Sequence, residues 1–150
     1  MVEITASAQI IIHRPAAEVF EAFADPEIMT KFWFPRASGR LEAGEEVRWY
    51  VGTSDDAFEI TVRVKSAEKP SSLHLQWGDG DAFTDVKWEF ESKSHNETVV
   101  RIRESGFSGD QSAVVVAALN STGGFNQVIV AAKALVEHGV HINVVNDHIA

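Results

Sequence analysis

GFNQVIVAAKALVEH, residues 124–138, is the stretch that decides the fold, because it has the pattern of a helix with one buried face. Its apolar residues recur at i, i+3, i+4, i+7, i+10 and i+11, and they are Phe125, Val128, Ile129, Ala132, Leu135 and Val136. This spacing places them on one stripe of a 3.6-residue helix. The rest of the chain must therefore supply a surface on which the stripe can pack.

The flanks of this stretch predict where the helix begins and ends. Ser121 or Thr122 can accept hydrogen bonds from the first backbone N–H groups, and Gly139 can adopt the left-handed conformation that ends a helix. Residues 110–119 also have a helical composition, whereas residues 120–124 predict a break or kink. We therefore expect the last long helix to begin at about residue 124.

The tail that follows, residues 140–150, has alternating apolar and polar residues. We expect it to pack in an extended form along the surface.

Upstream of the helix, apolar and polar residues alternate with a period of two, which is typical of strands with one buried face. The segments with this pattern are residues 4–12, 46–51, 58–65, 73–77, 85–90 and 100–103. Two short amphipathic helices, near residues 15–23 and 25–32, separate the first strand from the others. Short links between the later strands predict antiparallel neighbours. The sequence therefore predicts an α+β fold in which a curved antiparallel sheet wraps around the last helix.

Composition limits the classes of function. A chain of 150 residues with 45% hydrophobic content can form one domain, residues 1–150, with a real core. The formal charge of −9 argues against nucleic-acid binding, and the absence of a long apolar span argues against membrane insertion. With no cysteine and no signal-peptide pattern, we expect a soluble cytoplasmic protein.

Several short motifs, taken in order, resemble one superfamily. The opening motif consists of Ile12, Pro15, Glu18, Val19, Phe20, Ala22 and the pair Asp25-Pro26. Three further motifs are KFWFP at residues 31–35, ESGF at residues 104–107, and the pair Gly124-Phe125. The chain is similar to the START and birch-pollen-allergen (SRPBCC) superfamily, and within it to the bacterial branch related to the activator of the heat-shock-protein-90 ATPase. Phe125 stands where that superfamily usually has tryptophan.

This resemblance implies a helix-grip fold with a cavity between the sheet and the long helix. In this superfamily the cavity usually fits an apolar or aromatic small molecule. Members include lipid carriers, cyclases, hormone receptors and a chaperone-activating domain, so the resemblance does not settle one chemistry.

The four tryptophans are candidates for the wall of such a cavity. Trp49, Trp77 and Trp88 have the inward parity of their strands, and Trp33 lies in the segment expected at the cavity mouth. Large aromatic side chains also fill ordinary cores, and for each tryptophan alone that interpretation is favoured. The complete set of predicted ligand contacts is Trp33, Trp49, Phe58, Trp77, Trp88, Glu104, Phe125, Val128, Ile129 and Ala132.

Glu104 is the predicted polar contact, because it has the parity of Val100 and Ile102. A carboxyl group on the apolar side of the sheet could accept a ligand's hydrogen bond or move a proton. The alternative is that the strand ends here and that Glu104 turns to water. Glu104 is a weak catalytic candidate, and the sequence offers no second polar group for an enzyme site.

Other chemistries have little support. His138, His141 and His148 with Asp147 do not match a known metal-ligand spacing, and no G-x-S-x-G elbow is present. The pair Gly123-Gly124 lacks the lysine of a phosphate-binding loop, so we expect it to allow close packing of helix on sheet. We expect no metal and no cofactor.

Three hypotheses remain for the function. The leading one is reversible binding of a small apolar or aromatic molecule. The second is an enzyme of the cyclase or hydrolase kind that uses the same cavity. The third is a module that binds a chaperone or another protein through an acidic face.

Overall fold

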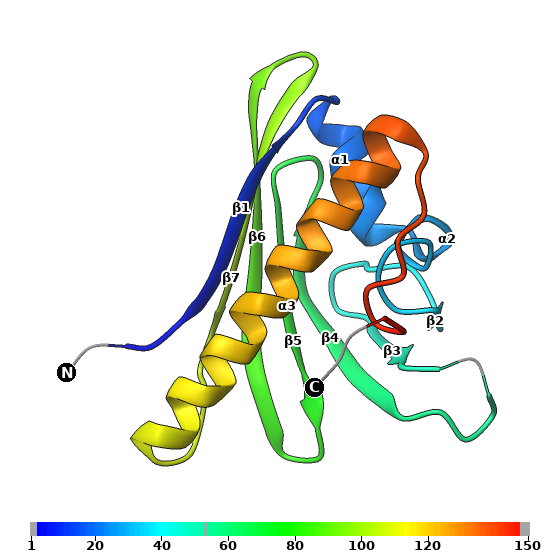
Figure 1. Ribbon diagram of the computed structural model, residues 1–150. Coiled ribbons are helices and arrows are strands. Elements are labelled where there is room, and N and C mark those ends of the chain that lie inside the picture. Colours follow the sequence, from blue (N-terminus) through cyan, green and yellow to red (C-terminus); the bar gives the residue numbers. More distant parts are fainter. Residues whose placement is uncertain (1–2, 53, 148–150) are drawn as a thin grey trace.

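The computed structural model describes residues 3–52 and 54–147. Its elements in chain order are β1 (Ala6–Ile12), α1 (Ala16–Ala24), α2 (Pro26–Met29), β2 (Arg36–Ala37), β3 (Glu46–Tyr50), β4 (Glu59–Glu68), β5 (Ser72–Asp79), β6 (Ala82–Ser94), β7 (Glu97–Ser105) and α3 (Gln111–His138). The strands form one seven-stranded sheet in the order β1-β7-β6-β5-β4-β3-β2, and every neighbouring pair is antiparallel. Figure 1 shows the sheet curving around α3, with α1 and α2 beside one end of that helix. The predicted α+β helix-grip fold is confirmed.

The concave face of the sheet holds the core. Its fully buried side chains have the parity that the sequence predicts, and they include Val62, Val64, Leu73, Leu75, Val86, Trp88, Val100 and Ile102. The stripe of α3 packs on them through Phe125, Val128, Ile129 and Ala132, each of which is at most 3% exposed. Burial of this apolar stripe holds the helix on the sheet.

Helix α3 begins at Gln111, so the break predicted at residues 120–124 is wrong. Asp110 caps the helix, because its carboxylate accepts a hydrogen bond from the backbone N–H of Ala113 at 2.9 Å. This cap lies well upstream of the two glycines. Gly123 and Gly124 each cost the helix about 1 kcal/mol in propensity. The cap at Asp110 on one side and the buried stripe from Phe125 on the other outweigh this cost.

The predicted cap residues therefore lie inside the helix. Thr122 donates its hydroxyl to the carbonyl of Ala118 at 2.8 Å, the usual bond of a threonine in mid-helix. The predicted stop is confirmed, because Gly139 has φ of 68° and ends α3. Beyond it, the described tail runs back beside α3 and turns, with the N–H of Asp147 donating to Asn143 O at 3.0 Å.

Polar contacts attach the end of α3 to the end of β1. The Lys133 ammonium donates to the carbonyl of Ile11 and to the carboxylate of Glu137, both at 2.6 Å. The backbone N–H of His13 also donates to Glu137, at 2.8 Å. Burial acts to raise the pKa of Glu137, but the hydrogen bonds from Lys133 and His13 outweigh it and hold that pKa below its usual range.

By length and composition alone, α3 could cross a membrane. Its second half is nevertheless the core helix of this fold, and core helices of soluble domains have the same composition.

Candidate functional site

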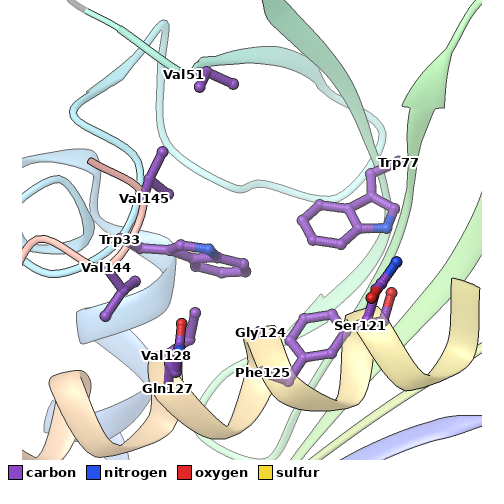
Figure 2. A pocket seen from close by; sticks show the side chains of 11 residues that line it. Trp33, Val51, Trp77, Ser121, Gly124, Phe125, Gln127, Val128, Val144 and Val145 are labelled. Atoms are coloured by element: carbon purple, nitrogen blue, oxygen red, sulfur yellow. The ribbon is translucent and has the colours of Figure 1, made fainter. Parts of the chain in front are cut away.

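A pocket of about 280 Å³ lies between α3, the end of β3 and the chain after α2 (Figure 2). Its lining residues are Trp33, Val51, Trp77, Asn120, Ser121, Gly124, Phe125, Gln127, Val128, Val144 and Val145. We call it the aromatic pocket. Most of this lining is apolar, and its polar side chains (Asn120, Ser121 and Gln127) are neutral.

Three aromatic rings form the inner wall of the aromatic pocket. Trp77 and Phe125 are stacked, with ring centroids 5.6 Å apart and an interplanar angle of 18°. Trp33 meets Phe125 edge to face at 6.3 Å and lies 5.8 Å from Trp77. β5 supplies Trp77, α3 supplies Phe125, and the turn after α2 supplies Trp33. The rings present flat faces and edges on which another aromatic ring can pack.

The two glycines of α3 have different surroundings. Gly124 lines the aromatic pocket, whereas Gly123 is exposed to solvent. A Cβ added at either position would meet nothing within 4 Å. The prediction that they allow close packing of helix on sheet is therefore wrong. At Gly124, the missing side chain leaves part of the pocket's space open.

The chain after α3 forms another wall. Val144 and Val145 are half-buried and line the aromatic pocket together with Gln127. This contact could not be predicted from the sequence, because an alternating tail shows that one side is buried but not what covers it. Asn120 and Ser121 were missed because the helix was expected to begin after them, and Gln127 was missed because it does not belong to the apolar stripe.

Glu104 points inward, as its parity predicts, and its residue is 3% exposed. One carboxyl oxygen, Oε2, accepts from the indole N–H of Trp77 at 2.8 Å and from the hydroxyl of Thr84. The other oxygen, Oε1, is buried and has no hydrogen-bond partner within residues 3–52 and 54–147. Glu104 is not part of the pocket lining and lies behind Trp77.

The other predicted contacts divide into core and surface. Trp49, Trp88 and Ile129 are each 1% exposed, Ala132 is fully buried, and none of these four lines the aromatic pocket. Trp49 supports the pocket from behind, with its ring centroid 4.9 Å from that of Trp33.

Phe58 lies outside the aromatic pocket. It precedes β4, is 58% exposed and lines a shallower hollow of about 270 Å³ that also borders Trp77 and Thr84. The prediction that Phe58 points inward rested on the alternation of a strand, and β4 begins one residue after it, at Glu59. We call this second hollow the sheet-end hollow.

Within the described residues, no group of three or more His, Asp or Glu side chains could hold a metal ion. His138 and His141 are exposed, and His148 lies outside the described residues. The aromatic pocket can stack and enclose a small apolar molecule, and its hydroxyl and amide side chains can form hydrogen bonds at its rim.

The family model described as "Activator of Hsp90 ATPase homolog 1-like protein" matches residues 13–137, which is most of the chain. None of the curated proteins is similar enough in sequence to match.

Solved structures have the same fold. The protein SSP2350 from Staphylococcus saprophyticus is 27% identical, with a TM-score of 0.76 over 92% of this chain and 95% of that chain. PFC0360w, an HSP90 activator from Plasmodium falciparum, is 17% identical, with a TM-score of 0.67 over 91% of this chain and 96% of that one. DynU16, from the dynemicin biosynthetic locus, is 20% identical, with a TM-score of 0.75 over 92% of this chain and 49% of that one.

Proposed function

We propose that this chain, which belongs to the family of activator of Hsp90 ATPase homolog 1-like proteins, binds a small apolar or aromatic molecule in the aromatic pocket. The observation that carries the proposal is the stacked pair of Trp77 and Phe125, with Trp33 against its edge, beside open space of about 280 Å³. A side chain that only filled the core would leave no such space. We propose the cytoplasm as the place where it acts.

The pocket's volume sets the size of the ligand. A water molecule occupies about 30 Å³ of liquid, so about 280 Å³ corresponds to roughly nine such volumes. That is below most sites for drug-sized ligands, which span about 300–1,000 Å³. A flat molecule with on the order of ten heavy atoms, such as a fused two-ring aromatic compound, matches this space.

Binding without turnover is the better supported form of this function. Among the described residues, Ser121 and Gln127 at the rim form no side-chain hydrogen bond with an acidic or basic group, and Glu104 is covered by Trp77. An enzyme of the cyclase or hydrolase kind would need a second group that shares a proton with Glu104 at the substrate. Loss of turnover in Glu104→Gln would support that alternative, and unchanged turnover would exclude this role.

A second candidate function is binding of a chaperone, and a specific surface favours it. Val115, Val116 and Leu119, on the first half of α3, are 37%, 58% and 67% exposed. Exposed apolar side chains on neighbouring turns of one helix are typical of interaction surfaces. The family's description and the Plasmodium falciparum neighbour point to Hsp90 as the first partner to test.

The aromatic pocket can be tested through tryptophan fluorescence and thermal unfolding in the presence of 2-methoxynaphthalene, with dodecanoate as an aliphatic comparison. Two tryptophans line the pocket, so occupancy should change their emission. At a ligand concentration of 100 Kd the stabilisation is about 2.7 kcal/mol, which raises Tm by roughly 5–10 °C in a domain of this size.

Leu119→Glu is the matched control, because Leu119 is exposed and outside the pocket lining. It should leave naphthalene binding unchanged and weaken binding to purified Hsp90 if the second function is present. The absence of a saturable change in fluorescence and in Tm for 2-methoxynaphthalene, dodecanoate and 2-naphthol alike would refute the pocket proposal.

A further inference from the structure

We infer that the aromatic pocket selects flat aromatic ligands that carry a hydrogen-bond donor, which is a phenolic hydroxyl or an aromatic N–H. The carboxyl group of Glu104, behind Trp77, accepts the hydrogen bond from this donor. The inference rests on the proposed function, because it concerns the ligand of the same pocket.

The first step is the position of Trp77 between two spaces. Of the described residues that line the aromatic pocket and the sheet-end hollow, only Trp77 borders both. Trp77 therefore lies between the two spaces. The sheet-end hollow has about 270 Å³ into which the ring can turn, and the space it leaves would then belong to the aromatic pocket. Trp77 is half-buried: the rings of Trp33, Phe34, Trp49 and Phe125 pack against its indole with centroids 5.6–6.4 Å away, and Trp77 also borders the two spaces.

The second step is what lies behind Trp77. Trp77 pairs with Thr84 across β5 and β6, and Val86 pairs with Glu104 across β6 and β7, so the three polar groups lie together on the concave face. Glu104 receives two donors on Oε2, from Trp77 and Thr84. Oε1 receives none from the part of the chain that the structure describes. The carboxyl group thus has acceptor capacity to spare in a place where water is excluded.

The third step is the chemistry that can replace the indole. When Trp77 turns away, Glu104 loses its indole donor and faces the pocket. A ligand with a phenolic O–H or an aromatic N–H restores that bond and can reach Oε1 as well. A ligand with only acceptor atoms cannot replace the indole donor and leaves Glu104 with the Thr84 hydroxyl as its one donor among the described residues, which costs about ten- to a hundredfold in affinity. A carboxylate ligand is worse, because it brings more acceptors and meets no cationic side chain among the lining residues that the structure describes.

The test compares three ligands on one scaffold by calorimetric titration of the full chain: 2-naphthol, 2-methoxynaphthalene and 2-naphthoate. The first two carry the same oxygen and differ in whether it can donate. We expect 2-naphthol to bind at least tenfold more tightly than 2-methoxynaphthalene, and 2-naphthoate to bind most weakly. Equal affinity for the first two, or tight binding of 2-naphthoate, would overturn the inference and leave the proposed function standing. If none of the three binds, the proposed function itself fails.

Two variants distinguish a Glu104 that accepts the ligand's hydrogen bond from a Glu104 that has only a structural role. Trp77→Phe keeps an aromatic wall but removes the indole N–H, so the ligand no longer competes for Glu104. Its preference for 2-naphthol over 2-methoxynaphthalene should rise several-fold above that of the wild type. In Glu104→Leu that preference should fall to about one. If Glu104→Leu does not fold, Trp77→Phe still decides the question, because an unchanged or smaller preference in it would overturn the inference.

The indole N–H resonance of Trp77 gives a direct readout, since it can be assigned by its loss in Trp77→Phe. Saturating 2-naphthol should shift this resonance away from its hydrogen-bonded position, because the indole gives up Glu104. A resonance that stays in place while 2-naphthol binds would contradict the replacement step.

Discussion

Alanine substitution at the two adjacent glycines of α3 separates the stability of the helix from the space of the aromatic pocket. Gly123 and Gly124 both lie in the middle of α3, and a Cβ at either would meet nothing within 4 Å. Each Gly→Ala change should therefore gain helix propensity, about 0.8–1 kcal/mol, without a clash. In a domain of this size that raises Tm by roughly 2–4 °C.

The two variants should differ in ligand binding. Only Gly124 lines the aromatic pocket, so only Gly124→Ala places a methyl group in the ligand's space. A methyl group takes up about the volume of one water, about 30 Å³, which is roughly a tenth of a pocket of about 280 Å³. Overpacking of this size costs about 1–3 kcal/mol, so affinity for a ligand that fills the pocket should fall roughly five- to 150-fold.

The assay is thermal unfolding of both variants without ligand, followed by titration with 2-methoxynaphthalene or 2-naphthol. Gly123→Ala is the matched control and should bind like the wild type. Equal binding by the two variants would show that the ligand does not occupy the space beside Gly124. A lower Tm for both would show that α3 does not run as a regular helix through this point.

Three further predictions concern stability. Trp88→Ala should lower the free energy of unfolding by about 3–5 kcal/mol, because Trp88 is 1% exposed. Trp77→Ala should lower it by clearly less, because Trp77 borders open space. Equal losses in denaturant titrations would contradict this difference. The lowered pKa of Glu137 means that its charge stabilises the fold above about pH 4.5 and ceases to do so as the pH falls. Glu137→Gln should therefore lower Tm at pH 7 and match the wild type in strong acid. A Tm difference that is the same at every pH would refute this. Gly78→Ala should destabilise by about 1–3 kcal/mol, since its Cβ would clash with the carbonyl oxygen of Ala82, and an unchanged Tm would show that the turn between β5 and β6 adjusts freely.

The sequence was sufficient for the fold because strand parity and helix periodicity are local signals. The buried sides of β4 to β7 and the stop at Gly139 could be read directly from residue spacing. The start of α3 could not, because two adjacent glycines have the composition of a break. The helix begins at its cap, Asp110, which lies upstream of the two glycines, so the residues around the glycines do not indicate it.

The site was only partly predictable, because parity reports which face of the sheet a residue occupies and not whether that face is filled. Trp77 and Trp88 have the same inward parity, yet one borders the aromatic pocket and the other is core. The difference is that Trp77 borders a space that Gly124, Val144 and Val145 also line, whereas Trp88 does not. The partners of Glu104 also required the cross-strand register, which depends on turn geometry. The role of these residues as ligand contacts stays a prediction.

Helix α3 has two halves with different surroundings, and the aromatic pocket lies where they meet. From Phe125 onward the helix is fixed to the sheet by its apolar stripe and to β1 by Lys133 and Glu137. Before Gly123, Val115, Val116 and Leu119 are exposed, whereas Ala118 is buried. A ligand in the pocket contacts both halves, because the lining extends from Asn120 to Val128 along the helix. Binding there should therefore order the first half of α3 against the sheet, and hydrogen exchange of the amides before Gly123 should slow when 2-naphthol is bound. Unchanged exchange would mean that the two halves are independent and that the exposed apolar surface does not respond to the ligand.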